Sequence, residues 1–191
     1  MCGILGVISR SNQTNPLAEV VIQKGISALE LRGPDGQQVQ PIPNGFLAHT
    51  RLAIIDPSER GTQPMKDESG RYTMVFNGEI YNYRALRQQL IQKGVSFRSE
   101  SDTEVLLHMY KMYGADALQH LNGCLAFAVY DAAEDHIFLA RDRIGINPLV
   151  YFQSHDTFGF SSEIKGLLPF IDELKIDKIS LFTYLQFNYV P

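Results

Sequence analysis

The chain has 191 residues, enough for one sizeable domain or two small ones, and its 17 Lys plus Arg against 21 Asp plus Glu give a formal net charge of −4. This mildly acidic balance provides no bulk attraction for nucleic acid or an anionic membrane surface, so the sequence predicts neither as a partner. Hydrophobic residues make up 45% and charged residues 20%, which suits a folded core. No segment approaches the ~18 consecutive apolar residues of a membrane span.

Strand and helix signals alternate in the first part of the chain. Residues 2–8 are apolar and β-branched over a short run, which predicts a buried strand. Asn15 followed by Pro16 is typical of a helix N-cap and first turn, and apolar residues at helical spacing extend this predicted helix to about Leu31. We then expect a turn cluster over residues 32–36, one or two strands over 45–55 and a polar surface loop over 56–70.

The middle of the chain carries helix signals behind one strand. The strand covers residues 72–76 and runs into Asn77-Gly78, where we expect the chain to turn. An amphipathic helix over 84–93 ends before Gly94, and a short strand follows over 95–98. Ser101 and Glu104 have the spacing of a capping box, which predicts the start of a second helix, and a shorter helix follows over 115–121.

The last third of the chain is dominated by strands. We expect them over residues 125–131, 136–141, 149–153 and 157–161, followed by a helix over 180–187. The turn near Gly145 and Pro148 follows two arginines, Arg141 and Arg143, which invite a carboxylate partner. Many antiparallel-type strands with a few helices predict a single α+β domain over residues 1–191.

The apolar start of the chain does not fit a secretory signal, because no basic region precedes it and no cleavage-site pattern follows. We therefore expect a cytoplasmic protein, in which thiols stay reduced. Two cysteines cannot build a disulfide framework, and the five histidines show no metal-ligand spacing. The sequence predicts no metal site, and it has no Gly-rich phosphate loop. Cys124, at the head of an apolar strand, is expected in the core.

Cys2 has two interpretations. Removal of Met1 before a small residue would leave Cys2 with a thiol and a free α-amine, whose ordinary pKa values are about 8.5 and about 7.7–8.0. Such an amine can act as general base for its own side chain, which is the N-terminal nucleophile arrangement. The alternative is a small buried cysteine that begins a strand.

Three further features each have a catalytic and a structural interpretation. The Asn77 side chain and the Gly78 N–H provide two donors for an oxyanion hole, or they form a plain Asn-Gly turn. Arg51 lies among apolar residues and either binds a ligand carboxylate or faces solvent from a strand edge. Asp102 either binds an ammonium group or favours the N-terminus of its helix.

Eight segments resemble, in this order, one known family. They are MCGILGV (1–7), RGPDG (32–36), AHTRLAIID (48–56), GTQPM (61–65), FNGEIYNYRALR (76–87), SDTEVLL (101–107), RDRIGINPLVY (141–151) and SSEIKGLL (161–168). The family is the class II glutamine amidotransferases, of the N-terminal nucleophile type. Within it, the chain is most similar to the glutaminase domain of glutamine-hydrolysing asparagine synthetases, and the resemblance covers essentially the whole chain.

The resemblance implies a four-layer αββα sandwich of two antiparallel sheets, the N-terminal nucleophile hydrolase fold. It also implies hydrolysis of the side-chain amide of L-glutamine to glutamate and ammonia. The roles it implies are a nucleophile with its freed α-amine (Cys2), an oxyanion hole (Asn77 and Gly78), a clamp for the α-carboxylate (Arg51), acceptors for the α-ammonium (Glu79 and Asp102) and backbone lining the site (Leu52 to Ile54).

In this family a tunnel carries ammonia to a C-terminal synthetase domain, which binds ATP through a Ser-Gly-Gly-x-Asp-Ser loop and uses Mg. That loop does not occur in the 191 residues, so we expect ATP and Mg only in the missing domain and no cofactor for the glutaminase half. The last residues are similar to the family's GYVP stretch, after which the parent protein continues. We therefore expect a truncated part of a longer chain, and we leave a homodimer open.

The chain departs from the family pattern at two places without a proposed catalytic role. Leu31 stands where the family often has His, and a Phe or Met is more usual near Cys124. These departures leave room for a specialised relative that supplies ammonia to another acceptor, such as a sugar or a secondary metabolite. The alternative that is not an enzyme is a catalytically silent regulatory or assembly module that keeps the fold.

Overall fold

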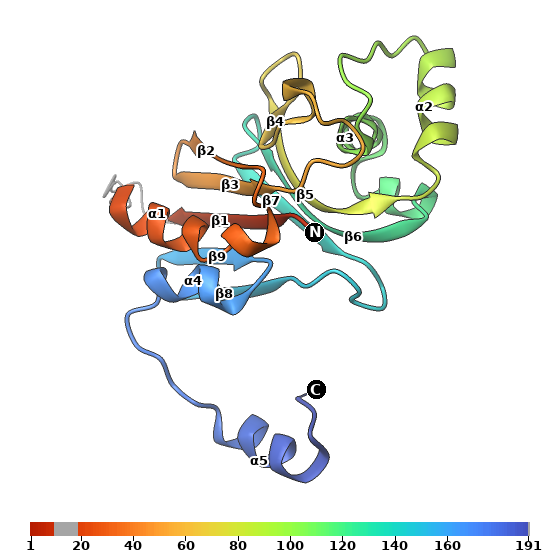
Figure 1. Ribbon diagram of the computed structural model, residues 1–191. Coiled ribbons are helices and arrows are strands. Elements are labelled where there is room, and N and C mark those ends of the chain that lie inside the picture. Colours follow the sequence, from red (N-terminus) through yellow and green to blue (C-terminus); the bar gives the residue numbers. More distant parts are fainter. Residues whose placement is uncertain (10–18, 191) are drawn as a thin grey trace.

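The computed structural model describes residues 1–9 and 19–190, and two antiparallel sheets form its centre (Figure 1). We call them sheet A and sheet B. Sheet A has the order β2 (Gly36–Ile42), β3 (Gly45–Arg51), β1 (Gly3–Ser9), β9 (Thr157–Ser161) and β8 (Val150–Gln153). Sheet B has the order β4 (Met65–Lys66), β5 (Tyr72–Ile80), β6 (Gly123–Asp131) and β7 (His136–Arg141).

Helices cover the outer face of each sheet. Sheet A packs against α1 (Glu19–Ser27) and α4 (Ile164–Leu167), whereas sheet B packs against α2 (Tyr83–Gln92) and α3 (Asp102–Tyr113). Short 3₁₀ turns lie at Glu30–Arg32, Glu59–Gly61, Gly114–His120 and Leu168–Phe170. The α+β class and the αββα layering expected from the resemblance are confirmed.

Three hydrophobic layers hold the four structural layers together. Because successive residues of a strand point to opposite faces, Ile4 of β1 lies between the sheets while Leu5 lies under the helices, and both are fully buried. A strand buried on both faces reads as a continuous apolar run, which is why residues 2–8 gave so clear a strand signal. The layer between the sheets consists of Ile4, Leu47, Val75, Ala126, Ala128, Tyr130 and Phe160.

The same alternation directs the central strands of both sheets toward one place. Cys2 precedes β1 and shares the face of Ile4, and the pairing of Gly3 with Thr50 continues to place Cys2 opposite Arg51. On β5, Asn77 shares the face of Val75, which lies in the layer between the sheets. Cys2, Arg51 and Asn77 therefore project into the space between the two sheets at the same end.

Two strand assignments from the sequence were wrong. The segment 95–98 is not a strand, and β2 was missed altogether. β2 reads GQQVQPI, with mostly exposed residues and no apolar face, because it is the edge strand of sheet A. Its pairing with β3 holds it in the sheet, and local sequence carries no sign of that pairing.

The expected turn at Asn77-Gly78 is also wrong, because β5 continues through both residues to Ile80. Asn77 pairs with Ala126 and Gly78 pairs with Leu125 on β6. A Cβ at position 78 would lie 2.3 Å from the carbonyl oxygen of Cys124, so only glycine lets the strands approach this closely.

The expected polar loop over 56–70 is more structured than its composition indicates. It contains β4 and a 3₁₀ turn, and Gly61, Gln63, Met65 and Asp67 are buried within it. The capping box is confirmed in part: the Ser101 side chain accepts a hydrogen bond from the Glu104 N–H at 3.2 Å.

The C-terminal helix α5 (Lys178–Phe187) stands apart from the four layers, and none of its residues is buried (Figure 1). Asp177 caps it by accepting hydrogen bonds from the N–H groups of Ile179 and Ser180. The predicted helix start at Asn15-Pro16 lies outside the described residues. No helix of residues 1–9 and 19–190 combines the length and apolar character needed to cross a bilayer.

Candidate active site

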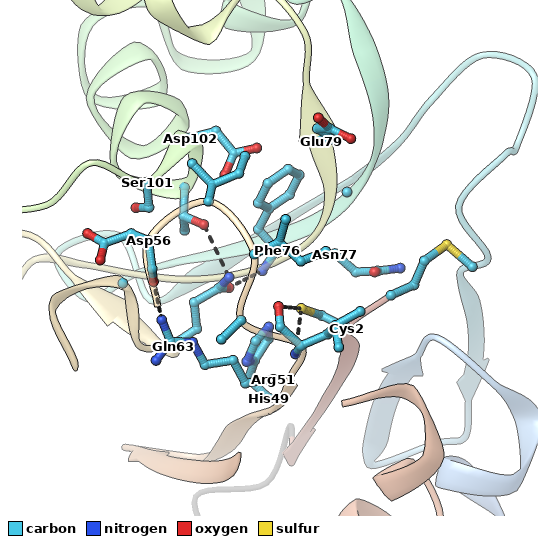
Figure 2. A pocket seen from close by; sticks show the side chains of 18 of the residues that line it. Cys2, His49, Arg51, Asp56, Gln63, Phe76, Asn77, Glu79, Ser101 and Asp102 are labelled. Atoms are coloured by element: carbon cyan, nitrogen blue, oxygen red, sulfur yellow. Dashed lines mark hydrogen bonds between the residues drawn. The ribbon is translucent and has the colours of Figure 1, made fainter. Parts of the chain in front are cut away.

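A cavity of about 300 Å³ opens between the ends of β1 and β3 on one side and β5 and α3 on the other (Figure 2). The structure brings every site residue expected from the sequence to its wall. These are Cys2, Arg51, Leu52, Ile54, Asn77, Gly78, Glu79 and Asp102.

The Cys2 thiol is held by the backbone of one residue, Leu52. Its Sγ accepts a hydrogen bond from the Leu52 N–H at 3.4 Å and donates to the Leu52 carbonyl at 3.7 Å. The Cys2 carbonyl accepts from Arg32 Nε at 2.8 Å, and Arg32 is paired with Glu163 at 2.9 Å. Burial raises the pKa of the Cys2 thiol, so at neutral pH it is a protonated group that needs a base before it can attack.

Arg51 does not face solvent from a strand edge; its guanidinium is anchored inside the pocket wall. Nη2 donates to the carbonyls of Asp56 and Ser58, the latter at 2.9 Å, and Nη1 donates to Thr62 Oγ1 at 3.4 Å. A guanidinium has five N–H donors, so Nε and one hydrogen of Nη1 are left for a ligand. These two N–H groups point from different sides of the guanidinium, so one of them can donate to a carboxylate oxygen while the cation attracts the negative charge.

The outer edge of β5 leaves one backbone donor open. Even-numbered residues of β5 direct their N–H groups away from β6, toward the edge that β4 covers only near Met74. Beyond β4, the Phe76 N–H donates to Gln63 Oε1 at 2.6 Å and the Ile80 N–H donates to Asp102 Oδ2 at 3.1 Å. Gly78 lies between them, and its N–H meets no acceptor in the described part of the chain.

Asn77 adds an amide beside this open donor. Its side chain is 1% exposed, and Nδ2 donates to Oδ1 of Asn147 at 3.3 Å. An amide nitrogen carries two hydrogens, and the bond to Asn147 uses one of them. The second Nδ2 hydrogen meets no acceptor among the described residues. The Gly78 N–H and the Asn77 Nδ2 are therefore two donors on one wall of the cavity, the arrangement that stabilises a developing oxyanion.

Two carboxylates face the cavity without a cation. Asp102 begins α3 and is 5% exposed, and burial raises its pKa to about 6 although the Ile80 N–H works against the shift. The charge of Glu79 raises it further. Within residues 1–9 and 19–190 neither carboxylate forms an ion pair. A buried carboxylate (Asp102) and a neighbouring exposed one (Glu79), neither paired with a cation, favour a cationic ligand group.

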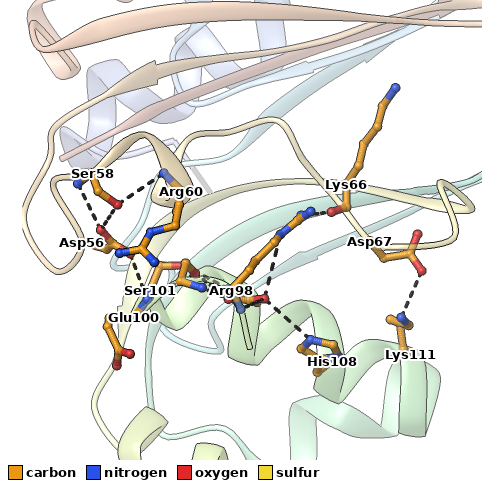
Figure 3. A network of polar contacts seen from close by, with 12 residues as sticks. Asp56, Ser58, Arg60, Lys66, Asp67, Arg98, Glu100, Ser101, His108 and Lys111 are labelled. Atoms are coloured by element: carbon orange, nitrogen blue, oxygen red, sulfur yellow. Dashed lines mark hydrogen bonds and ion pairs between the residues drawn. The ribbon is translucent and has the colours of Figure 1, made fainter. Parts of the chain in front are cut away.

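The loop that anchors Arg51 is fixed to the start of α3 (Figure 3). Asp56 Oδ2 accepts from the Glu100 N–H at 2.8 Å, and Asp56 Oδ1 accepts from the Ser58 hydroxyl at 2.6 Å. Glu104 accepts from the Ser99 N–H at 2.7 Å; burial raises its pKa, but hydrogen bonds from His108 and Ser99 hold that pKa at about 2. The network places Arg51 and Asp102 in one rigid frame.

We expected Cys124 in the core, and this prediction is wrong. It is half-buried at the start of β6, lines the same cavity as Cys2, and its Sγ accepts a hydrogen bond from Tyr81 Oη at 3.4 Å. β6 begins next to the open end of the sheets, so the apolar residues after Cys124 are buried while Cys124 is not.

Sequence reasoning missed several polar residues in the cavity wall, and three of them bear on its chemistry. His49 is 2% exposed, and burial lowers its pKa to about 3, so it is neutral. Gln63 bridges the Phe76 N–H and Thr103 Oγ1, the latter at 3.2 Å. The third is Asn147. Their signal was a polar residue within an otherwise apolar or turn segment, which is common and unspecific. The described ranges contain no group of His, Cys, Asp and Glu arranged to hold a metal ion.

Comparisons with known proteins agree with this geometry. Residues 1–191 match the sequence profile of the glutamine amidotransferase domain. The chain is 38% identical over 196 residues to asparagine synthetase [glutamine-hydrolyzing] 1 and 39% identical over 184 residues to asparagine synthetase [glutamine-hydrolyzing] 3, both of Bacillus subtilis (strain 168). These alignments cover 100% and 95% of the chain, and the chain spans only 30% of the length of each relative.

Solved structures show the same fold. Glutamine phosphoribosylpyrophosphate amidotransferase from B. subtilis, complexed with ADP and GMP, superimposes with a TM-score of 0.70 at 23% identity. The match covers 87% of the chain and 43% of that protein. A structure described as the allosteric regulatory enzyme of purine biosynthesis gives a TM-score of 0.71 at 23% identity, over 88% and 43% of the two chains.

Proposed function

The chain belongs to the glutamine amidotransferase domain family, and we propose that it hydrolyses the side-chain amide of L-glutamine to glutamate and ammonia. One observation carries the proposal: the Cys2 thiol, the open Gly78 N–H and charged groups of both signs line a single cavity of about 300 Å³. A nucleophile, oxyanion donors and counter-charges for a zwitterion are the parts that amide hydrolysis of a free amino acid requires.

The proposed reaction begins at Cys2 Sγ. The thiol proton passes to the Cys2 α-amine as the sulfur attacks the amide carbon, and the amine then returns this proton to the departing ammonia as the C–N bond breaks. Water hydrolyses the resulting thioester to glutamate and restores the thiol. In the described structure Met1 is joined to the Cys2 nitrogen, and an amide nitrogen is no base, so the active form must begin at Cys2.

Charge develops on the amide oxygen during the attack. We assign its stabilisation to the Gly78 N–H and the Asn77 Nδ2, the two donors beside Cys2 on the sheet B wall. Each such donor contributes roughly 10²–10³-fold to kcat in comparable sites. The raised pKa of the Cys2 thiol supports a mechanism in which the base acts together with the attack rather than on a thiolate formed in advance.

The amino-acid end of glutamine needs charges of both signs. The Arg51 cation, with an N–H group left for a ligand, suits its α-carboxylate, and Asp102 and Glu79 suit its α-ammonium. Leu52, which is half-buried, and Ile54, which is 72% exposed, line the cavity beside them. These assignments select a free amino acid over a glutamine inside a polypeptide, which lacks both charges.

The ammonia acceptor is proposed from the relatives. Because the chain spans 30% of the length of two asparagine synthetases, we infer that it supplies ammonia to an ATP-dependent asparagine-synthetase-type domain. ATP and Mg would act there, and the glutaminase part would use no cofactor. A sugar or secondary-metabolite acceptor is the second candidate. Cytoplasmic location and a homodimer stay predictions.

The test combines intact mass with turnover. Protein with Met1 removed, verified by mass spectrometry, should release glutamate and ammonia from free glutamine, whereas protein that keeps Met1 should not. Equal turnover by the form that keeps Met1 would contradict the N-terminal nucleophile mechanism. No glutamate from the Met1-free form would favour the silent module. Aspartate-dependent consumption of ATP by the full-length protein would separate the two candidate acceptors.

A further inference from the structure

Asn147 is a buried amide in the cavity wall to which the mechanism above gives no task. It lies in the connection between β7 and β8, is 1% exposed and lines the cavity together with Cys2 and Asn77. Its Oδ1 accepts the hydrogen bond from Asn77 Nδ2 at 3.3 Å. The residue therefore touches the side chain assigned to the oxyanion and belongs to neither sheet.

The connection between β7 and β8 holds the backbone of Asn147 from both sides. Asp142 Oδ2 accepts from the Asn147 N–H at 3.0 Å, and Arg141 Nε donates to the Asn147 carbonyl at 2.7 Å. Asp142 Oδ2 also accepts from the Leu125 N–H at 3.2 Å, which ties the connection to β6 beside Gly78. Arg141 therefore binds backbone carbonyls rather than the carboxylate partner that the sequence led us to expect.

The two amides have unused hydrogen-bonding capacity. Asn77 Oδ1 and Asn147 Nδ2 are both buried, and neither has a hydrogen-bond partner in the part of the chain that the structure describes. Because no described residue binds Asn77 Oδ1, the hydrogen bond to Asn147 Oδ1 is the contact among residues 1–9 and 19–190 that distinguishes the nitrogen of the Asn77 amide from its oxygen. If that acceptor were lost, the Asn77 amide could rotate and present its oxygen to the developing negative charge, which would oppose the reaction.

We propose that Asn147 is a positioning residue for amide hydrolysis: its Oδ1 fixes the Asn77 carboxamide so that the second Nδ2 hydrogen is available to the oxyanion. This assignment rests on the proposed glutaminase function. It concerns an interaction that matters only as charge develops, so it predicts an effect on kcat rather than on KM.

The test uses Asn147→Leu, which has a similar volume and no acceptor, with Ile146→Ala as the matched control. Ile146 is the neighbouring residue in the same connection, is 59% exposed and does not line the cavity. Asn147→Leu should lower kcat for glutamine about five- to tenfold, the effect of one lost hydrogen bond, with KM unchanged; Ile146→Ala should leave both unchanged. Asn147→Ala repeats the measurement if the leucine variant does not fold.

A double variant separates positioning from a direct contact. If Asn147 acts through Asn77, then Asn77→Ala with Asn147→Leu should lose no more kcat than Asn77→Ala alone. Additive losses, an effect confined to KM, or an unchanged kcat in Asn147→Leu would each overturn the assignment.

A spectroscopic measurement separates this proposal from the proposed function. In the ¹⁵N-labelled protein, the side-chain amide signals of Asn77 should shift in Asn147→Leu and stay in place in Ile146→Ala. Unshifted signals would show that the amide contact does not hold Asn77 and would overturn the positioning role. Wild-type protein without glutaminase activity, but with the expected shift, would instead locate the failure in the proposed reaction.

Discussion

The two sheets meet at one cavity and contribute groups of opposite kinds. On the sheet A side, the backbone N–H and carbonyl of Leu52 hold Cys2, and the carbonyls of Asp56 and Ser58 hold Arg51. On the sheet B side, no described residue provides an acceptor for the Gly78 N–H or a cation for Asp102. The sheet A side is thus internally bonded, and we call it the bonded wall. The sheet B side keeps a free donor and an unpaired carboxylate, and we call it the open wall.

The difference assigns separate tasks to the two walls. Groups that are already bonded are fixed before a ligand arrives, which suits a nucleophile and a clamp that must be correctly placed. Groups left without an acceptor or a counter-charge gain most from a ligand, because no such partner has to be displaced first. We therefore expect changes on the sheet A side to act through position and changes on the sheet B side to act through lost interactions.

The largest effect should come from the bonded wall. Cys2→Ala should reduce glutamate release by roughly 10⁴–10⁶-fold, because the variant lacks the proposed nucleophile, which carries its own α-amine base. Cys124→Ala is the matched control, since Cys124 is the second thiol in the same cavity and should be dispensable. A glutamine-like diazo-ketone should label Cys2 and spare Cys124 in peptide mapping. Labelling of Cys124 alone would reverse the assignment.

The next effect belongs to the open wall. Asn77→Ala should lower kcat by roughly 10²–10³-fold with a small change in KM, because its amide meets charge that is present only in the tetrahedral intermediate. Steady-state kinetics with glutamine gives both constants, and the melting temperature controls for loss of fold. If the alanine variant is unstable, Asn77→Asp keeps the size and removes the donor. A change confined to KM would make Asn77 a substrate contact instead.

Arg51→Ala should act mainly on KM, which we expect to rise roughly 10–100-fold, the value of a lost hydrogen bond to a charged group. Because Arg51 also holds the carbonyls of Asp56 and Ser58, the melting temperature should fall as well. Arg51→Lys separates the two effects, since it keeps the charge but lacks the planar fork. A normal KM in Arg51→Ala would exclude the carboxylate clamp.

The smallest effect, and the most specific, is a dependence on pH. In its proposed role Asp102 must be ionised to bind the α-ammonium of glutamine, so KM should rise as the pH falls through about 6, the raised pKa of this carboxyl. Asp102→Asn should have a high KM that no longer varies over this range. Initial rates between pH 5 and pH 8 test this, and the same pH profile in both proteins would contradict it.

The free energy of unfolding should fall as the pH rises, so stability and glutamine binding depend on pH in opposite directions. The folded protein holds the Asp102 proton up to about pH 6, whereas the unfolded chain releases it near 3.8, so Asp102 lowers the free energy of unfolding as the pH rises through this interval. Asp102→Asn should therefore be more stable than wild type at pH 8, by up to about 3 kcal/mol, and equal to it below pH 4. Urea unfolding at the two pH values measures the difference.

Strands with continuous apolar runs were predicted well, because such runs are local signals. The bounds of β7 and β9 agree with those expected, and β1 differs by one residue. β2 could not be found, because its place at the sheet edge depends on pairing with β3 and not on its own residues. The path of β5 through Asn77-Gly78 depends in the same way on close contact with β6.

The site residues could be named from the sequence, largely through the resemblance, but their geometry could not. The spacing along the chain did not show that Gln63 and Asp102 take the donors on either side of Gly78. It did not show that Cys124 leaves the core, because burial at the end of a strand depends on what the neighbouring sheet covers. Asn147 gave no signal beyond a polar residue before proline.

The partly unpaired edge of β5 also affects whether molecules of this protein can associate by pairing their strands. An open strand edge offers alternating donors and acceptors to any extended chain, which invites aggregation between sheets. Gln63 and Asp102 occupy the donors at Phe76 and Ile80, so a foreign strand finds a single vacant N–H and cannot build a ladder. The carbonyl oxygen of a small amide needs only this one backbone donor, with the Asn77 side chain as the second. The edge is therefore closed to polypeptide and open to a small amide.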